Sequence, residues 1–266
     1  MESPSTDVGI EVADGVARLT IDRPEARNAL SWEAIRALRL LLAHLRVDPS
    51  VRVVVLAGAG EVAFCSGADL SAMADAVDGD PAVTHAARGE LAGLFTDLWA
   101  LGKPTVARVR GYALAGGFGL ACACDLIVAA DDAIFGTPEI DVGLWPHMIT
   151  VPLVRSMAPK RALELMMTGR RVDATEAERI GFVHRVVSVT QLDAAVAELT
   201  ATLASKSPVA LRLGRDGFYA TWDMAAADAL AALHPLLSVT AATDDATEGL
   251  AAFRDKRPPR WTDVPP

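Results

Sequence analysis

The sequence has few of the cysteines from which disulfide frameworks and metal sites are built. It contains only Cys65, Cys122 and Cys124 among 266 residues, an odd number that cannot all pair with one another. Cys122 and Cys124 are separated by one residue, which is neither the CxxC spacing of a redox pair nor a zinc motif. We therefore expect reduced, buried thiols and no metal.

Long apolar runs, a secretory leader and an excess of positive charge are also missing. The longest charge-free apolar run, Gly111 to Cys124, is about fourteen residues, whereas a membrane-spanning helix needs roughly twenty. The N-terminal stretch has no basic segment followed by an apolar one, so we expect a cytoplasmic protein. The net charge of −9 argues against nucleic acid or an anionic membrane as the partner.

The apolar pattern predicts an α/β fold. Val8–Val12 and Val16–Ile21, separated by Asp14-Gly15, indicate a β-hairpin, and a helix is expected from about Ser31 to Arg46. Val51–Ala57 is a β-branched run typical of a strand that is buried on both faces. Strand, helix and strand in this order imply a crossover connection. The further elements expected are strands at Pro104–Val109 and Leu126–Ala130, a glycine-rich turn at Gly111–Gly119, a helix at Leu120–Cys124 and mostly helix after Pro159.

Two glycine-centred turns are the first candidates for a functional site. Ala63–Leu70 and Gly111–Gly119 each lead from a strand into a helical pattern. Backbone N–H groups at a helix N-terminus lack partners and lie at the positive end of the dipole. Two such turns side by side could stabilise one carbonyl oxygen as an oxyanion, although glycines that only permit tight packing are the alternative. The second turn contains neither GxGxxG nor GK[ST], which excludes a dinucleotide fingerprint and a P-loop.

Glu139 is the candidate for acid–base chemistry. It follows a strand and a proline within an apolar stretch, where a carboxyl group has a raised pKa and can act as a general base or acid. A helix cap or a surface carboxylate is the alternative. Asp141 fits a turn or capping role better, and His147 lies close enough in sequence to line the same pocket.

These motifs, taken in order, resemble the crotonase (enoyl-CoA hydratase/isomerase) superfamily. The resemblance runs nearly from end to end. The matching segments are Arg23-Pro24, Asn28-Ala29-Leu30, Phe64-Cys65-Ser66-Gly67-Ala68-Asp69-Leu70, Lys103–Ala107, Gly111–Gly117, Pro138-Glu139, Thr168-Gly169-Arg170 and Glu248-Gly249 with Phe253 and Lys256-Arg257. The resemblance implies a spiral of repeated ββα units over residues 1–195 and a helical C-terminal trimerisation region over residues 196–266.

The resemblance also implies roles for individual residues. The N–H groups of Ala68 and Gly116 would form the oxyanion hole for a coenzyme A thioester, and Glu139 would be the catalytic acid/base. Phe253 and Lys256 would contact coenzyme A in a neighbouring subunit of a homotrimer or dimer of trimers. The full set implied to hold the acyl-CoA substrate, with no separate cofactor, is Arg27, Ala29, Ser66, Asp69, Leu70, Gly117, Phe253 and Lys256.

One position departs from the hydratases of this family, which use two glutamates. The first matches Glu139, but the place of the second is Gly119, and Trp145–Ile149 replaces a glycine-rich stretch. Hydration is most easily achieved by two carboxylates that hold one water, and losing one acid–base group costs about 10²–10⁴-fold. We therefore predict a family enzyme in which Glu139 alone favours double-bond isomerisation over hydration. A non-catalytic or regulatory acyl-CoA-binding protein and thioester hydrolysis are the alternatives.

Overall fold

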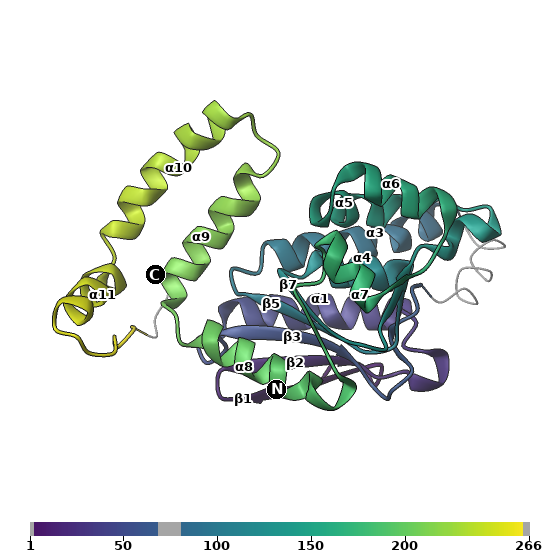
Figure 1. The fold of residues 1–266 in the computed structure, drawn as a ribbon, viewed down its shortest axis with the longest axis horizontal. Helices are drawn as coiled ribbons and strands as arrows, with labels where there is room; N and C mark the ends of the chain where they lie inside the picture. Colours follow the sequence, from purple (N-terminus) through teal and green to yellow (C-terminus); the bar gives the residue numbers. More distant parts are fainter. Residues whose placement is uncertain (1–2, 69–80, 263–266) are drawn as a thin grey trace.

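Two β-sheets organise the chain in the computed structural model, which describes residues 3–68 and 81–262 (Figure 1). The larger sheet has six strands in the order β1-β2-β3-β5-β7-β10, and the smaller has four in the order β4-β6-β8-β9. The strands of the larger sheet are β1 (Val8–Ala13), β2 (Val16–Ile21), β3 (Val53–Gly58), β5 (Thr105–Val109), β7 (Leu126–Ala130) and β10 (Arg185–Val187). Those of the smaller sheet are β4 (Ala63–Cys65), β6 (Tyr112–Leu114), β8 (Ile134–Gly136) and β9 (Val172–Asp173).

The N-terminal hairpin and the parallel strands that follow it agree with the sequence pattern. β1 and β2 pair antiparallel, and the two turn residues between them, Asp14 and Gly15, both have positive φ, as tight hairpins require. β2, β3, β5 and β7 run parallel to one another, so the connections between them cross over the sheet. The predicted α/β class is confirmed.

Helices cover both faces of the larger sheet. In β3, Val54 and Leu56 belong to the main core together with the apolar face of α1, whereas Val53 and Val55 pack with residues of α8. This alternation explains the uninterrupted β-branched run in the sequence. The helices are α1 (Trp32–Val47), α3 (Pro81–Trp99), α4 (Gly116–Ala123), α5 (His147–Ser156), α6 (Pro159–Thr168), α7 (Ala174–Ile180), α8 (Leu192–Ala204), α9 (Pro208–Thr221), α10 (Ala226–Ala241) and α11 (Asp244–Arg254). None of the helices in the described ranges is long and apolar enough to cross a membrane.

The short strands of the smaller sheet differ from the sequence-based expectation. The sequence pattern predicts a turn at Gly111–Gly119, but this segment contains strand β6 and the first turn of α4. The helix at Leu120–Cys124 accordingly begins earlier, at Gly116. Strands of two or three residues show no hydrophobic periodicity, so they leave no pattern in the sequence.

The C-terminal helices form an arm that projects from the core. Figure 1 shows α9 and α10 side by side and α11 on the outer side of the arm, away from the two sheets. The Ser207 hydroxyl, at the start of α9, donates to Asp245 of α11. α8, by contrast, lies against the larger sheet through Leu192, Ala195 and Val196. The predicted boundary between residues 195 and 196 therefore falls inside α8, and the projecting part begins with α9.

Candidate active site

Three parallel strands of the smaller sheet bring the candidate residues to one edge. β4 pairs with β6 and β6 with β8, so that Cys65 is opposite Ala113 and Leu114 is opposite Gly136. The carboxyl ends of parallel strands meet at the same sheet edge. Ala68 follows β4, Gly116 follows β6 and Glu139 follows β8, and the register therefore places all three at that edge.

The turn after β4 is held by an adjoining turn of the chain. Ser66 N–H donates to the carbonyl oxygen of Arg27 (3.1 Å), and Leu30 N–H donates to that of Gly67 (2.7 Å). The buried amide of Asn28 donates to the carbonyl of Ala63 at 2.7 Å. These bonds fix the backbone just before Ala68.

The turn before α4 contains an unusual backbone conformation. Ala115 has φ 50° and ψ −128°, a region that non-glycine residues rarely adopt and that costs about 1–3 kcal/mol. Its N–H donates to the Gly136 carbonyl (2.9 Å), and its carbonyl accepts the Gly119 N–H (3.1 Å). The strain is therefore held in place by β8 on one side and by the first turn of α4 on the other.

The two turns touch each other through glycine. Gly67 has φ +106°, and a Cβ placed there would lie 2.6 Å from the Ala115 Cβ and 3.2 Å from the Gly116 nitrogen. A Cβ on Gly116 would lie 3.6 Å from the Ala68 nitrogen. Only glycine at position 67 permits this approach, which brings the backbones of the two turns close together.

Both N–H groups are available as donors. Gly116 is the first residue of α4, so its N–H has no acceptor within the helix and lies at the positive end of the dipole. Among the described residues, no hydrogen bond uses the N–H of Ala68. Such a pair can stabilise negative charge that develops on a carbonyl oxygen.

Glu139 lies in the short 3₁₀ turn Pro138–Val142 directly after β8. Its Oε2 is buried and has no hydrogen-bond partner in the described parts of the chain. Burial, which disfavours the charged form, raises the pKa of this carboxyl group above its usual range. An unpartnered carboxyl oxygen with a raised pKa is the expected state of a group that exchanges protons with a ligand.

Gly119 lies in the first turn of α4 and faces apolar side chains. A Cβ placed on it would be 2.6 Å from the Ile149 Cβ and 3.3 Å from the Phe95 Cζ. The neighbouring Phe118 is buried and packs with Phe135 and Phe182, at ring-centroid distances of 5.0–5.5 Å.

The sequence matches known proteins along almost its whole length. The family model described as enoyl-CoA hydratase/isomerase matches residues 11–264. The chain belongs to the enoyl-CoA hydratase/isomerase family. A probable enoyl-CoA hydratase of Mycobacterium leprae is 37% identical over 260 residues, which cover 94% of this chain and 97% of that protein. The carnitinyl-CoA dehydratase of Proteus mirabilis is 35% identical over 97% of this chain and 98% of its own length.

Solved structures of this family share the fold. The crystal structure of an enoyl-CoA hydratase of Mycobacterium smegmatis superposes with a TM-score of 0.92 and 33% identity, over 97% of this chain and 99% of that one. The resemblance to the crotonase superfamily that the sequence motifs suggested is confirmed.

The structure places the other residues that the family motifs suggested in different parts of the fold. Arg27, Ala29 and Ser66 lie beside the Ala68 turn, with Arg27 exposed and Ala29 buried. Gly117 is buried, and a Cβ on it would lie 2.7 Å from the Cys65 carbonyl carbon, so the missing side chain serves the packing of α4 on β4. Asp69 and Leu70 lie outside the described residues.

Phe253 and Lys256 are not brought to this edge within the single chain. Phe253 is on α11 and its side chain is 87% exposed, and Lys256 follows the same helix. Figure 1 shows α11 on the outer side of the arm, away from the two sheets. Asp141 and His147 are both exposed, and His147 begins α5. No cluster of three or more potential metal-ligating side chains occurs in the described ranges.

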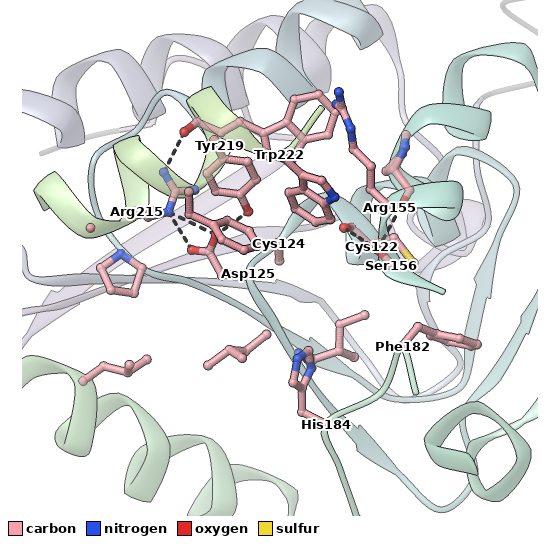
Figure 2. A pocket seen from close by; sticks show the side chains of 18 of the residues that line it. Cys122, Cys124, Asp125, Arg155, Ser156, Phe182, His184, Arg215, Tyr219 and Trp222 are labelled. Carbon is pink, nitrogen blue, oxygen red and sulfur yellow. Dashed lines mark hydrogen bonds and ion pairs between the residues drawn. The ribbon is translucent and has the colours of Figure 1, made fainter. Parts of the chain in front are cut away.

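A cavity of about 590 Å³ lies elsewhere, where the arm joins the core, and no motif in the sequence points to it (Figure 2). The Arg215 guanidinium on α9 pairs with Asp125 (2.8 Å) and donates to the carbonyl of Trp99 (2.7 Å). Tyr219 also donates to Asp125. Neither Glu139 nor either of the two glycine turns lines this cavity, so we assign these groups to anchoring the arm.

Proposed function

We propose that this chain is an acyl-CoA enzyme that isomerises a double bond, with Glu139 as its single acid/base. The observation that carries the proposal is the buried, unpartnered Glu139 oxygen at the same sheet edge as the N–H groups of Ala68 and Gly116. One base and one oxyanion site are sufficient for a 1,3-proton shift. The retained carboxyl group with its raised pKa argues against a carrier that only binds acyl-CoA.

The reaction begins with the substrate carbonyl oxygen between the two N–H donors. The Glu139 carboxylate removes a proton from C2 of a 3-enoyl-CoA, and the electron pair moves onto the thioester oxygen to give a dienolate. Glu139, now a carboxylic acid, returns the proton to C4. The double bond then lies between C2 and C3, and no atom has been gained or lost.

Two contributions lower the barrier. Each oxyanion donor is worth roughly 3–4 kcal/mol, because it acts on charge that develops only in the transition state. The raised pKa of Glu139 brings the carboxyl group closer to the pH at which it both accepts and returns a proton readily.

Coenzyme A would be held beside the same turns. The exposed Arg27 next to Ser66 offers a guanidinium that can pair with a phosphate group. We propose that the backbone around Ala29, Asp69, Leu70 and Gly117 also contacts the acyl-CoA substrate. Phe253 and Lys256 would contribute from a neighbouring subunit.

The experiment that tests isomerisation against hydration identifies each product by mass and by chromatographic separation, because the 3-enoyl-CoA and 2-enoyl-CoA isomers have the same mass. A 3-enoyl-CoA and the corresponding 2-enoyl-CoA are supplied in parallel over several chain lengths. Isomerisation leaves the mass unchanged, hydration adds one water, and thioester hydrolysis releases free coenzyme A. We expect turnover of the 3-enoyl-CoA to exceed hydration of the 2-enoyl-CoA. Efficient hydration without isomerisation would overturn the proposal.

We also propose that the arm assembles with further copies of the chain into a homotrimer or a dimer of trimers. Large apolar side chains are exposed along α9, α10 and α11, among them Phe218, Leu230, Leu237 and Leu250. Exposed apolar surface of this kind usually marks an interface. Light scattering should therefore give a trimer or hexamer mass, and Leu230→Asp with Leu237→Asp should lower it. A parent that is monomeric at assay concentration would contradict this assembly.

A further inference from the structure

The inner side of α4 at Gly119 is closed by Ile149 of α5. The Ile149 side chain is 2% exposed and that of Phe95 is 3% exposed. Real Cβ atoms essentially never come within 3.0 Å of another heavy atom, yet a Cβ on Gly119 would lie 2.6 Å from the Ile149 Cβ. Position 119 therefore cannot carry any side chain while Ile149 keeps its place.

Ile149 has little freedom to move aside. Its branched Cβ restricts it to one strongly preferred rotamer in a helix. The first turn of α5 is fixed by Thr150, whose N–H and hydroxyl both donate to the Pro146 carbonyl at 3.0 Å. The Thr150 hydroxyl also lies 3.4 Å from the Met166 sulfur on α6.

The wall around the first turn of α4 is apolar on a second side as well. A Cβ on Gly116 would lie 3.7 Å from the Leu91 Cδ2, so α3 supplies methyl groups next to the oxyanion donor. Leu91, Phe95 and Ile149 offer no hydrogen-bond acceptor or donor through their side chains. A water in this region would have to be held by the Glu139 carboxylate without a second polar side chain from this wall.

We infer that Ile149 determines the reaction specificity of this site. Its side chain fills the space that a side chain at position 119 would need. An attacking water therefore has no second polar side chain to bind it, and Glu139 is limited to moving a proton between carbon atoms. This inference rests on the proposed function, since it explains why isomerisation is favoured over hydration there.

The test is a double-mutant cycle on positions 119 and 149, measured as hydration of crotonyl-CoA. Gly119→Glu alone is expected to fold poorly or to hydrate no better than the parent. Gly119→Glu with Ile149→Ala is expected to hydrate about 10²-fold faster than either single variant, which is the lower end of an acid–base contribution. The matched control is Gly119→Glu with Ile35→Ala, which removes an equally buried isoleucine on α1 and should give no rescue.

A second pair keeps the inference testable if the glutamate variants do not fold. Gly119→Ala should lower the unfolding midpoint by roughly 5 °C, because overpacking outweighs the better helix propensity of alanine. Ile149→Ala in the same chain should restore part of this loss. If Gly119→Ala alone is as stable as the parent, Ile149 does not fill the space and the inference is wrong.

The cycle separates this inference from the proposed function. A parent that hydrates crotonyl-CoA efficiently and does not isomerise would overturn the proposed function, whatever the coupling between the two positions. Equal hydration by Gly119→Glu with and without Ile149→Ala would overturn the role of Ile149 alone. A folded double variant that binds crotonyl-CoA but hydrates it no faster than Ile149→Ala would do the same.

Discussion

Replacing Gly67 with alanine tests the contact between the two oxyanion turns. The new Cβ meets two obstacles, a backbone at φ +106° and the Ala115 Cβ at 2.6 Å. The strained backbone costs about 1–3 kcal/mol and the overpacking about as much again. Because the Gly116 nitrogen would be 3.2 Å from the new methyl group, the two turns must move apart. Displacing one N–H donor from the proposed oxyanion hole should lower kcat by about 10²–10³-fold.

Gly181→Ala is the matched control for Gly67→Ala. Gly181 has almost the same φ, +103°, but nothing lies within 4 Å of a Cβ there. It therefore reports the backbone strain without the clash. Urea unfolding should show a larger loss of free energy of unfolding for Gly67→Ala than for Gly181→Ala, and only Gly67→Ala should lose isomerase activity. Equal stabilities, or a Gly67→Ala variant with full activity, would refute the reasoning.

Three further predictions concern titration and burial. Because the pKa of Glu139 is raised, the rise of kcat/KM with pH should have an apparent pKa above that of an ordinary carboxyl group. An apparent pKa of about 4.3 would contradict this. Burial raises the pKa of Cys65 and Cys122 to about 12 and also raises that of Cys124, so the native thiols should resist alkylation. The thiols have a lower pKa in the unfolded chain than in the folded one, so the free energy of unfolding should fall as pH rises above about 9. A rise of the free energy of unfolding in that pH range would contradict the burial of the thiols. Arg215→Leu should cost about 3–5 kcal/mol in urea unfolding, because it removes the cation that pairs with Asp125, whose side chain is only 18% exposed. A loss below about 1 kcal/mol would rule out this anchoring role.

The long elements of the fold could be predicted because each has a periodic or continuous apolar pattern. The helix at α1 begins at the capping residue Ser31, whose hydroxyl accepts the Ala34 N–H, and β7 has the predicted bounds Leu126–Ala130. The smaller sheet could not be predicted, because strands such as β6 contain three residues and are specified by pairing across the fold.

The candidate site could be predicted only in part, because some of its residues have a local signal in the sequence and others do not. The two glycine turns and Glu139 carry local chemistry that is visible in the sequence. Ile149 carries none, because its role depends on the packing of α5 against α4, which is a tertiary contact. The anchoring pair of Asp125 and Arg215 is 90 residues apart and equally hidden.

The measurement that tests the central claim most directly is turnover and binding by Glu139→Gln on one preparation. Glutamine keeps the size of the side chain but cannot accept the C2 proton. The account predicts that isomerisation of a 3-enoyl-CoA falls by about 10²–10⁴-fold while acyl-CoA binding changes by no more than a few-fold. A folded Glu139→Gln protein that isomerises at the parental rate would show that another group moves the proton.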